Sequence, residues 1–420
     1  MREMKDSGIA WIGAIPAAWG VHRIASHFQE IKEKNTANAY SNALQFKMGK
    51  IIAKPQKWDE DETNETYSAY TVVHPNTIMV NGLNLEFDFV TQRVARVECN
   101  GIITSAYIAL SPRDDINAEY ICYLLKSYDA CRAFHSMGRG LRKILSYSEL
   151  KNKPIVIPPL AEQERIAAFL DAECAEIDAV LEKTRASIEE YKKLKQAVIT
   201  QAVTKGIRGD RPMKDSGIEW IGEIPAEWDV LNLVAHTSML TPMRDRPENL
   251  DGPIPWVRIE DFEGKYIESS KAGLGVSMKT VKEMNLKVYP VGTILCTSSC
   301  IMGKCAIVSR ELVSNQRFIG IIPDRTTDKT YLYYLMTSNA ERMNFLSTGA
   351  LQANLSRSAF EHLKVQFPPY SEQQEIAAYL DDKCEKIDEL ILKKQQYLTE
   401  IENYKKSLIY EYVTGKKEVI

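Results

Sequence analysis

The sequence lacks a long uninterrupted apolar run, although 45% of its 420 residues are hydrophobic. A helix that spans a bilayer needs about 18 or more consecutive apolar residues, and every apolar stretch here is shorter. The first residues include Glu3 and Asp6, and no apolar segment follows them, so a secretory signal is not indicated. The composition supplies enough apolar residues for two ordinary cores. We therefore expect a two-domain protein of the cytoplasm.

The eight cysteines lack the spacing of a metal site or of a disulfide framework. They include no C-x-x-C pair and have no histidines at partner spacing, which argues against a zinc knuckle. Cys296, Cys300 and Cys305 form a loose cluster in a strand-like stretch. Metal binding there is an alternative, but buried thiols in a reducing compartment are the favoured interpretation. We expect no bound metal.

Signatures of nucleotide binding and catalysis are also missing. Neither G-x-x-x-x-G-K-[ST] nor G-x-G-x-x-G occurs, so no local loop would cradle phosphates. The Phe-Pro-Pro-Tyr run at residues 367–370 imitates an adenine-methyltransferase signature, but it lacks the polar first residue that bonds the target amino group. We interpret it as the stop between a strand and a helix. Pro323-Asp324 has no nearby Asp/Glu-x-Lys of a metal-dependent nuclease, and the six histidines suggest no triad. We predict no catalytic residue and no bound cofactor.

What the sequence does contain is an internal repeat. Residues 4–19 recur as residues 213–228 with thirteen of sixteen positions identical, including Lys-Asp-Ser-Gly-Ile-x-Trp-Ile-Gly. Residues 158–171, which begin Pro-Pro-x-x-Glu-Gln, recur as residues 368–381 at an offset of 210. Between these anchors, Tyr120 and Tyr123 return as Tyr331 and Tyr334 at an offset of 211. Three matches in the same order indicate two copies of one unit.

The inserts at residues 24–115 and 233–325 show no correspondence. Strand-like pieces lie at residues 77–80, 87–97 and 101–110 in the first insert and at 292–297, 304–308 and 318–322 in the second. Each insert is followed by a tyrosine-rich helix, near residues 118–134 and 328–345. A constant frame with unlike α+β inserts is what a reader of two unlike targets would need. The predicted segments are modules at 1–157 and 213–367, long helices at 158–205 and 368–417, and a linker at 206–212.

Both long helices carry a heptad seam. Its predicted members are Leu170, Ile177, Leu181, Ile188, Val198, Leu380, Ile387, Ile391, Leu398 and Leu408. Residues 162–182 hold seven acids and one base, whereas residues 183–205 hold six bases and two acids. The second helix repeats this, with seven acids and two bases in 372–392 and six bases and three acids in 393–417. An antiparallel pair sets each acidic start against a basic end, so we predict an antiparallel coiled coil.

The short linker agrees with antiparallel pairing. Seven residues cannot lead the chain back along a helix of about 43 residues, which at ~1.5 Å per residue is about 65 Å long. The first helix would therefore deliver the chain to module 2 at its far end, and the second would return it, which places Met1 near Ile420. The alternative is that each helix packs separately on its own module.

Candidate DNA contacts come from local clusters, because neither module is basic. Module 1 has 19 bases and 17 acids, and module 2 has 17 bases and 18 acids. The chain alone should therefore attract the phosphates of DNA only weakly. The glycine-hinged loop of module 1 offers Arg139, Arg142 and Lys143, where arginine suits guanine or phosphate. The matching loop of module 2 offers Gln352, Asn354 and Arg357, of which the amides suit adenine. Further candidates are Gln45, Lys47, Lys50, Lys54, Arg258, Asn315, Gln316 and Arg317.

A competing interpretation is that each of these side chains is merely solvated. The doubled tryptophans Trp11, Trp19, Trp220 and Trp228 lie in the shared frame, so we interpret them as packing anchors rather than as stacking platforms for bases.

The doubled motifs, each with its long helix, resemble the specificity (S) subunit of type I restriction-modification systems over essentially the whole chain. The resemblance implies two target-recognition domains on an antiparallel two-helix coiled coil with pseudo-twofold symmetry, which read the halves of a bipartite site in double-stranded DNA. It further implies a non-catalytic subunit that recruits two methyltransferase subunits and, in a full complex, two restriction subunits. S-adenosylmethionine, ATP and Mg²⁺ would be bound by those partners.

Two other function classes compete with this one. A structural tether with two protein-binding heads would fit the nearly neutral charge. A divergent DNA methyltransferase would need cofactor and catalytic motifs that the sequence lacks.

Overall fold

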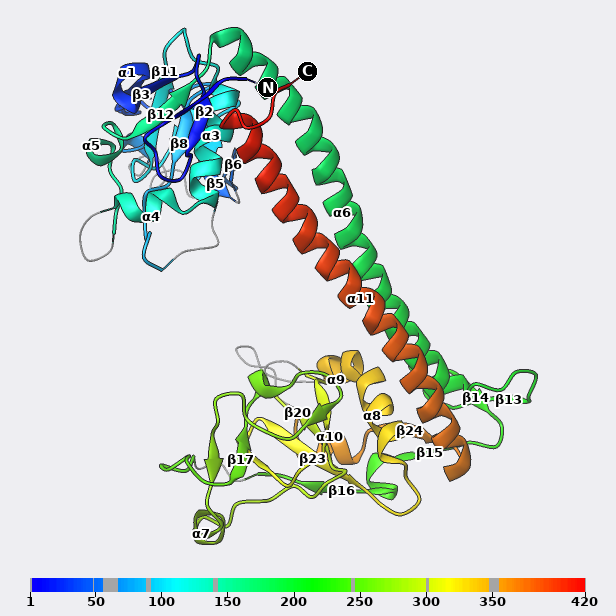
Figure 1. Cartoon of the computed structure of the whole chain (residues 1–420). Helices are drawn as coiled ribbons and strands as arrows, with labels where there is room; N and C mark the ends of the chain where they lie inside the picture. The colour runs from blue at the N-terminus through cyan, green and yellow to red at the C-terminus, as the bar shows by residue number, and fades with distance from the viewer. Residues whose placement is uncertain are drawn as a thin grey trace. The chain divides into compact units, whose positions relative to one another are not determined.

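The computed structural model describes residues 2–47, 49–55, 67–87, 92–138, 143–242, 246–299, 302–346 and 355–419. The chain divides into two compact units (Figure 1). Unit 1 contains Met1–Arg185 and Gln396–Ile420, and unit 2 contains Ala186–Gln395. The division runs through the two long helices rather than at their ends. Each unit therefore holds one globular part together with a portion of both helices.

The repeated motifs build the same frame in both units. In unit 1, β1 (Met4–Asp6) pairs with β2 (Ala14–Pro16), and β3 (Gly20–Arg23) pairs with β12 (Pro154–Ile157). In unit 2, β13 (Met213–Asp215) pairs with β14 (Glu223–Pro225), and β15 (Asp229–Asn232) pairs with β24 (Lys364–Phe367). The registers also agree, because Lys5 lies opposite Ile15 as Lys214 lies opposite Ile224. The internal repeat is thus confirmed as a structural repeat.

The inserts contain a common sheet that their sequences do not reveal. In unit 1 the strand order is β4 (Phe28–Glu30), β11 (Ile108–Pro112), β8 (Ile78–Val80) and β9 (Val94–Arg96). In unit 2 it is β16 (Thr237–Leu240), β23 (Phe318–Pro323), β20 (Ile294–Thr297), β21 (Cys305–Val308) and β18 (Tyr266–Ile267). Leu110 pairs with Glu30 and Ile78, as Ile321 pairs with Met239 and Ile294. The first four strands are therefore equivalent, and the expected α+β fold is confirmed.

Around this common sheet the inserts differ. Unit 1 adds the pairs β5 (Leu44–Lys47) with β6 (Lys50–Ala53) and β7 (Thr71–Val73) with β10 (Gly101–Ile103). Unit 2 adds a three-stranded sheet of β19 (Gly275–Val276), β17 (Ile254–Val257) and β22 (Val313–Ser314), with the helix α7 (Met278–Glu283). The strand-like stretch predicted at 101–110 is in fact two strands, β10 and the start of β11. Of the stretch at 87–97, only β9 is a strand in the described residues.

The tyrosine-rich helices are α3 (Ala118–Ala130) in unit 1 and α8 (Lys329–Ser338) in unit 2, and both are shorter than expected. Short helices follow each of them: α4 (Ala133–Met137) and α5 (Tyr147–Leu150) in unit 1, and α9 (Ala340–Leu346) and α10 (Arg357–Glu361) in unit 2. Asn117 and Asp328 cap α3 and α8 by accepting backbone N–H bonds. The predicted helix at 118–134 breaks because Arg132 has a left-handed φ of 58°. The smaller turns are α1 (Ile24–His27), η1 (Leu233–Ala235) and η2 (Ile259–Asp261).

The two long helices are α6 (Leu160–Lys205) and α11 (Tyr370–Val413). Each begins directly after a proline pair. Helix α11 ends at Val413 rather than at the expected residue 417, and Gly415, two residues after its end, takes a left-handed φ of 68°. The seam residues Leu170, Leu181, Ile188, Leu380, Ile387 and Leu408 are buried, and Ile177, Val198, Ile391 and Leu398 are half-buried. In unit 1 the seam joins the core of the globular part, which contains Leu170 and Leu408. In unit 2 the seam likewise joins the core of the globular part, which contains Leu380.

Ion pairs establish that α6 and α11 run antiparallel within each unit. In unit 1, Asp178 pairs with Lys405 at 2.6 Å and Arg185 pairs with Glu402 at 2.7 Å, so one number rises as the other falls. In unit 2, Lys195 of α6 pairs with Asp388 of α11 at 2.6 Å. The antiparallel prediction is confirmed, and separate packing of each helix on its own module is excluded. Arg2 lies 3.2 Å from Glu418, so both ends of the described chain lie in unit 1, as expected.

Within unit 1, a buried polar cluster joins the start of α6 to the frame. Glu162 accepts a 3.0 Å bond from the indole of Trp19 and pairs with Arg2. Gln163 accepts from the backbone N–H of Asn117 and donates to the carbonyl of Pro158. Together these bonds connect the frame hairpin, the cap of α3 and the first turn of α6. The acids at the helix start therefore do more than complement the helix dipole.

Unit 2 contains the same cluster at the start of α11. Glu372 accepts a 3.0 Å bond from the indole of Trp228 and pairs with Arg211. Gln373 accepts from the N–H of Asp328 and donates to Pro368. Trp19 and Trp228 are buried, so the prediction that they are packing anchors is confirmed.

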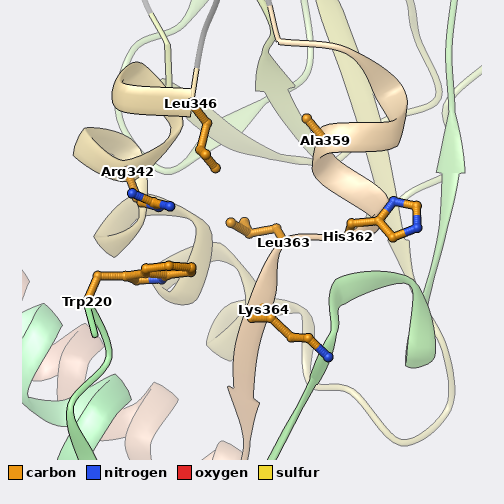
Figure 2. Close-up of a pocket in the computed structure, with 7 residues that line it drawn as sticks. All are labelled: Trp220, Arg342, Leu346, Ala359, His362, Leu363 and Lys364. Atoms are coloured by element: carbon orange, nitrogen blue, oxygen red, sulfur yellow. The ribbon is translucent and has the colours of Figure 1, made fainter. Parts of the chain in front are cut away.

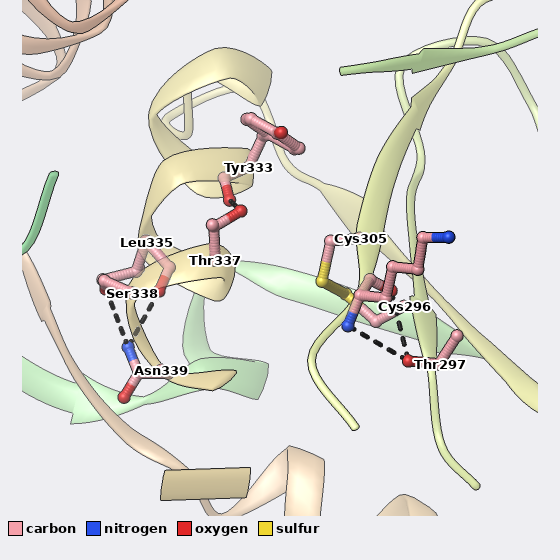
Figure 3. Close-up of a disulfide and its surroundings, with 9 residues drawn as sticks. Cys296, Thr297, Cys305, Tyr333, Leu335, Thr337, Ser338 and Asn339 are labelled. Carbon is pink, nitrogen blue, oxygen red and sulfur yellow. Dashed lines mark hydrogen bonds between the residues drawn. A yellow bond between two sulfur atoms is a disulfide. The ribbon is translucent and has the colours of Figure 1, made fainter. Parts of the chain in front are cut away.

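The prediction of buried thiols is wrong for two of the three clustered cysteines. Cys296 and Cys305 lie opposite each other on β20 and β21 and form a disulfide (Figure 3). Direct cross-strand pairing brings the two sulfurs together, and this register could not be read from the spacing. Cys300 lies outside the described residues. No helix in the described part of the chain is both long and apolar enough to cross a bilayer.

Candidate nucleic-acid interface

The loop predicted to read DNA in unit 1 is fastened to the sheet. Residues 139–142 lie outside the described residues, but both flanks are defined. Leu145 donates its backbone N–H to the carbonyl of Gly82 at 2.9 Å, and Lys143 accepts a 3.3 Å bond from the N–H of Leu85. Gly82 and Leu85 belong to the connection between β8 and β9. The predicted reading loop and this connection therefore form one assembly.

The predicted reading loop of unit 2 is fastened in the same way. Leu355 follows residues 347–354, which are not described, and donates its backbone N–H to the carbonyl of Ser298 at 2.9 Å. Leu145 and Leu355 are equivalent at the repeat offset of 210. Ser298 lies in the connection between β20 and β21, as Gly82 lies between β8 and β9. The two units thus share an attachment point while the attached loops differ in sequence.

In unit 1, a buried arginine shapes the connection between β8 and β9. The guanidinium of Arg93 donates to the carbonyls of Leu83 at 2.7 Å and Asn81 at 3.2 Å. The carboxylate of Asp129 on α3 accepts the backbone N–H of Arg93. These bonds satisfy carbonyls that the turn would otherwise leave unpaired. Phe87, in the same connection, is 76% exposed.

In unit 2, the connection between β20 and β21 is shorter and more tightly closed. The hydroxyl of Thr297 accepts from the N–H of Lys304 at 3.1 Å and donates to its carbonyl at 3.3 Å (Figure 3). The disulfide of Cys296 and Cys305 closes the same hairpin one residue further from its tip. The ammonium group of Lys304 lies 6.0 Å from the ring centroid of Phe262.

The structure brings three of the predicted contacts of unit 2 to this hairpin. Asn315, Gln316 and Arg317 form the turn between β22 and β23, which is closed by a 3.0 Å bond from the N–H of Arg317 to the Asn315 side chain. The carbonyl of Arg317 accepts from the N–H of Ser298 at 2.8 Å, so the turn and the base of loop 347–354 meet at one residue. The side chains of Gln316 and Arg317 are exposed there.

The remaining predicted residues are dispersed. Lys47 and Lys50 lie opposite each other at the tip of the β5–β6 hairpin, with Gln45 on β5. Lys54 lies 5.9 Å over the ring of Tyr70. Lys143 is exposed beside its loop. Two arginines are engaged in ion pairs, Arg258 with Glu260 at 3.0 Å and Arg357 with Glu361 at 2.7 Å. Arg139, Arg142, Gln352 and Asn354 lie outside the described residues, so their role stays a prediction.

A repeated tyrosine bond positions the tyrosine-rich helix on the long helix. Tyr123 donates to Asp171 at 2.7 Å in unit 1, and Tyr334 donates to Asp381 at 2.7 Å in unit 2. Burial is the larger cause, and the bond to the carboxylate is the second, of a pKa that is far above the usual value for each phenol. Both hydroxyls therefore stay protonated and remain donors. In unit 2, Lys265 from the insert also pairs with Asp381. That pair ties the variable insert to α11.

Sequence reasoning missed several of the residues that hold this interface. Arg2 and Arg211 were not noticed, although both lie two residues before the repeated motif and so extend the repeat. Gly82 and Ser298 carried no signal, because they lie in inserts without visible correspondence. Trp220 was interpreted as a packing anchor, but its side chain is 43% exposed and contacts Arg342.

Comparison with known proteins agrees with this arrangement. The family profile described as the type I restriction modification DNA specificity domain matches residues 100–190 and 229–403, which is more than half of the chain. Two specificity subunits from Methanocaldococcus jannaschii are similar. The type I restriction enzyme MjaIX subunit is 36% identical over 176 residues, which cover 39% of this chain and 40% of that subunit. The MjaVIII subunit is 23% identical over 434 residues, which cover 96% of this chain and 94% of that subunit.

Solved structures share the fold across nearly the whole chain. A chain from a study of complex assembly and conformational transition of the type I R-M system has a TM-score of 0.74 at 13% identity, and covers 96% of this chain and 99% of its own. The HsdS subunit from Thermoanaerobacter tengcongensis has a TM-score of 0.50 at 15% identity, with coverages of 96% and 98%. The profile match, joined to the doubled frame and its two unlike inserts, means that this chain belongs to the family of type I restriction-modification DNA specificity subunits.

Proposed function

We propose that this chain is the non-catalytic, cytoplasmic specificity subunit of a type I restriction-modification complex, in which unit 1 reads one half of a split DNA target and unit 2 reads the other. The observation that carries the proposal is the equivalent attachment of two different loops, through Leu145 to Gly82 and through Leu355 to Ser298. Equivalent attachment would present both loops in the same way to DNA. Different side chains on the loops would then select different bases.

The paired helices would set the number of unread base pairs between the half-sites. A continuous α6 of 46 residues and an antiparallel α11 of 44 residues provide a stiff element of defined length. The helices would also dock two methyltransferase subunits, which would bind S-adenosylmethionine. In a full complex, two restriction subunits would supply ATP- and Mg²⁺-dependent cleavage. Apolar side chains exposed outside the seam, including Leu392 and Tyr404, support helix docking by partners.

The direct test is to co-express the chain with its methyltransferase subunit and to map the methylated adenines. We expect a split motif with a fixed unspecified gap, because two separate loops read the DNA. A continuous motif or no sequence preference would contradict the proposal. A tether with two protein-binding heads would give no methylation that depends on this chain, so the same map separates the two functions.

A further inference from the structure

A hollow of about 220 Å³ lies in unit 2 (Figure 2). Its walls come from parts of the frame and from the short helices. Trp220 belongs to the connection between β13 and β14, and Arg342 and Leu346 belong to α9. His362 follows the end of α10, and Lys364 is the first residue of β24. Leu346 is the last described residue before the loop, so the hollow adjoins the predicted reading loop. None of the lining residues is acidic.

The guanidinium of Arg342 is held in place by aromatic rings. Its central carbon lies 3.8 Å from the ring centroid of Trp220 and 4.9 Å from that of Phe345. Phe345 is 78% exposed. The Nε of Arg342 has no hydrogen-bond partner in the described part of the chain. That Nε is buried, so the donors within reach of a ligand are those of the terminal nitrogens. Stacking fixes the plane of the guanidinium, and a planar fork of N–H donors suits phosphate oxygens.

The equivalent place in unit 1 has different chemistry. Trp11, which corresponds to Trp220, packs edge-on against Tyr128 at 5.6 Å. Position 128 corresponds to Asn339 in unit 2, and there the indole of Trp220 stacks with Arg342 instead. The lining of a hollow in unit 1 includes Glu149, Asn152 and Lys153, whose counterparts in unit 2 are Ala359, His362 and Leu363. Only unit 2 therefore presents a stacked arginine with a second cation at this place, among the described residues.

We propose that Arg342 and Lys364 bind the phosphate backbone of DNA next to the half-site that unit 2 reads. This inference rests on the proposed function, because the hollow adjoins the loop that we assign to base reading. Unit 2 has no excess of basic residues, so local cations must supply its phosphate contacts. Backbone contacts position a protein on DNA without selecting a sequence. Arg342 and Lys364 are thus positioning residues for the loop at 347–354.

The test uses the complex of this chain with its methyltransferase subunit, carrying Arg342→Gln and Lys364→Gln together. Binding to the methylated motif and to a scrambled duplex is measured by fluorescence anisotropy over a range of salt concentrations. Loss of two phosphate contacts should lower the slope of log K against log salt by about 2, since each contact contributes about 0.9. Affinity should fall equally for both duplexes, and the methylated motif should stay the same.

The matched control removes two cations from α7 of the same unit, with Lys279→Gln and Lys282→Gln. Helix α7 lies at the end of the globular part remote from α9 (Figure 1), so the control should leave the salt slope unchanged. The single variant Lys364→Gln should lower the slope by about 1. It provides a second test of the inference in case the double variant misfolds.

Two results would overturn the inference. One is a salt slope that equals the wild-type slope in the folded double variant. The other is loss of the methyltransferase subunit from the variant with unchanged DNA affinity, which would assign the hollow to a carboxylate-bearing segment of that partner. Failure of the proposed function is seen separately, as the absence of a split motif in the methylation map of the wild type. The salt slope does not depend on that motif, because it can be measured on any duplex.

Discussion

Replacing Arg211 with alanine is expected to lower the free energy of unfolding of unit 2 by about 3–5 kcal/mol, because it leaves a buried carboxylate without its counter-charge. The side chain of Glu372 is only 3% exposed and that of Arg211 is 10% exposed. Arg211 also donates to the carbonyl of Lys205 at the end of α6. Chemical denaturation followed by tryptophan fluorescence measures the effect, since Trp228 bonds to the same carboxylate.

Arg208→Ala is the matched control. Arg208 pairs with Glu375, which lies on α11 as Glu372 does, but this pair is at the exposed surface. Removal of an exposed pair should change stability far less. Adding Glu372→Gln to Arg211→Ala should recover part of the loss, since a neutral amide can still accept the bond from Trp228 without an uncompensated charge. Equal effects of Arg211→Ala and Arg208→Ala would disprove the structural role assigned to the buried pair.

Gly82→Ala is expected to abolish sequence reading by unit 1 while unit 2 continues to read its half-site. An added Cβ at position 82 would overlap the carbonyl oxygen of Leu145, which is backbone and cannot move without moving the loop at 139–142. The bond from the N–H of Leu145 to the carbonyl of Gly82 would be lost with the same displacement. Mapping of methylated adenines in the complex should then find one half of the split motif degenerate and the other intact.

The control for this variant is Gly209→Ala, because a Cβ at Gly209 would meet no atom within 4 Å. Its methylation map should match that of the wild type. An unchanged motif in folded Gly82→Ala would mean that the loop at 139–142 does not depend on the connection between β8 and β9, and would remove the main support for the reading assembly.

Local patterns predicted the frame and the helix pairing well. Thirteen identities in sixteen positions predicted two copies of one unit, although not the hairpins that these residues form. The segregated charges of α6 and α11 predicted their antiparallel direction, which ion pairs such as Asp178 with Lys405 confirm. These features depend on residues close in sequence or on a simple period, so they can be read without knowing the fold.

The equivalence of the two inserts could not be predicted in this way. Leu110 and Ile321 hold the same place in the sheet, but a buried strand position requires only an apolar side chain of suitable size. The disulfide of Cys296 and Cys305 depends on the register of β20 with β21, which non-local pairing determines. The stacking of Trp220 with Arg342, where Trp11 packs against Tyr128, depends on side chains that are distant in the sequence. Each of these features follows from contacts between distant segments of the chain.

The central claim is that paired helices hold two different readers at a set separation on DNA. Its most direct test is to delete one heptad from each helix at facing positions, residues 189–195 and 389–395, which keeps the seam in phase. Seven residues at ~1.5 Å each remove about 10 Å, or about three base pairs of DNA. We expect the map of methylated adenines to keep both half-sites and to shorten the gap between them by that amount. Retention of the original gap in a folded, active complex would contradict the claim.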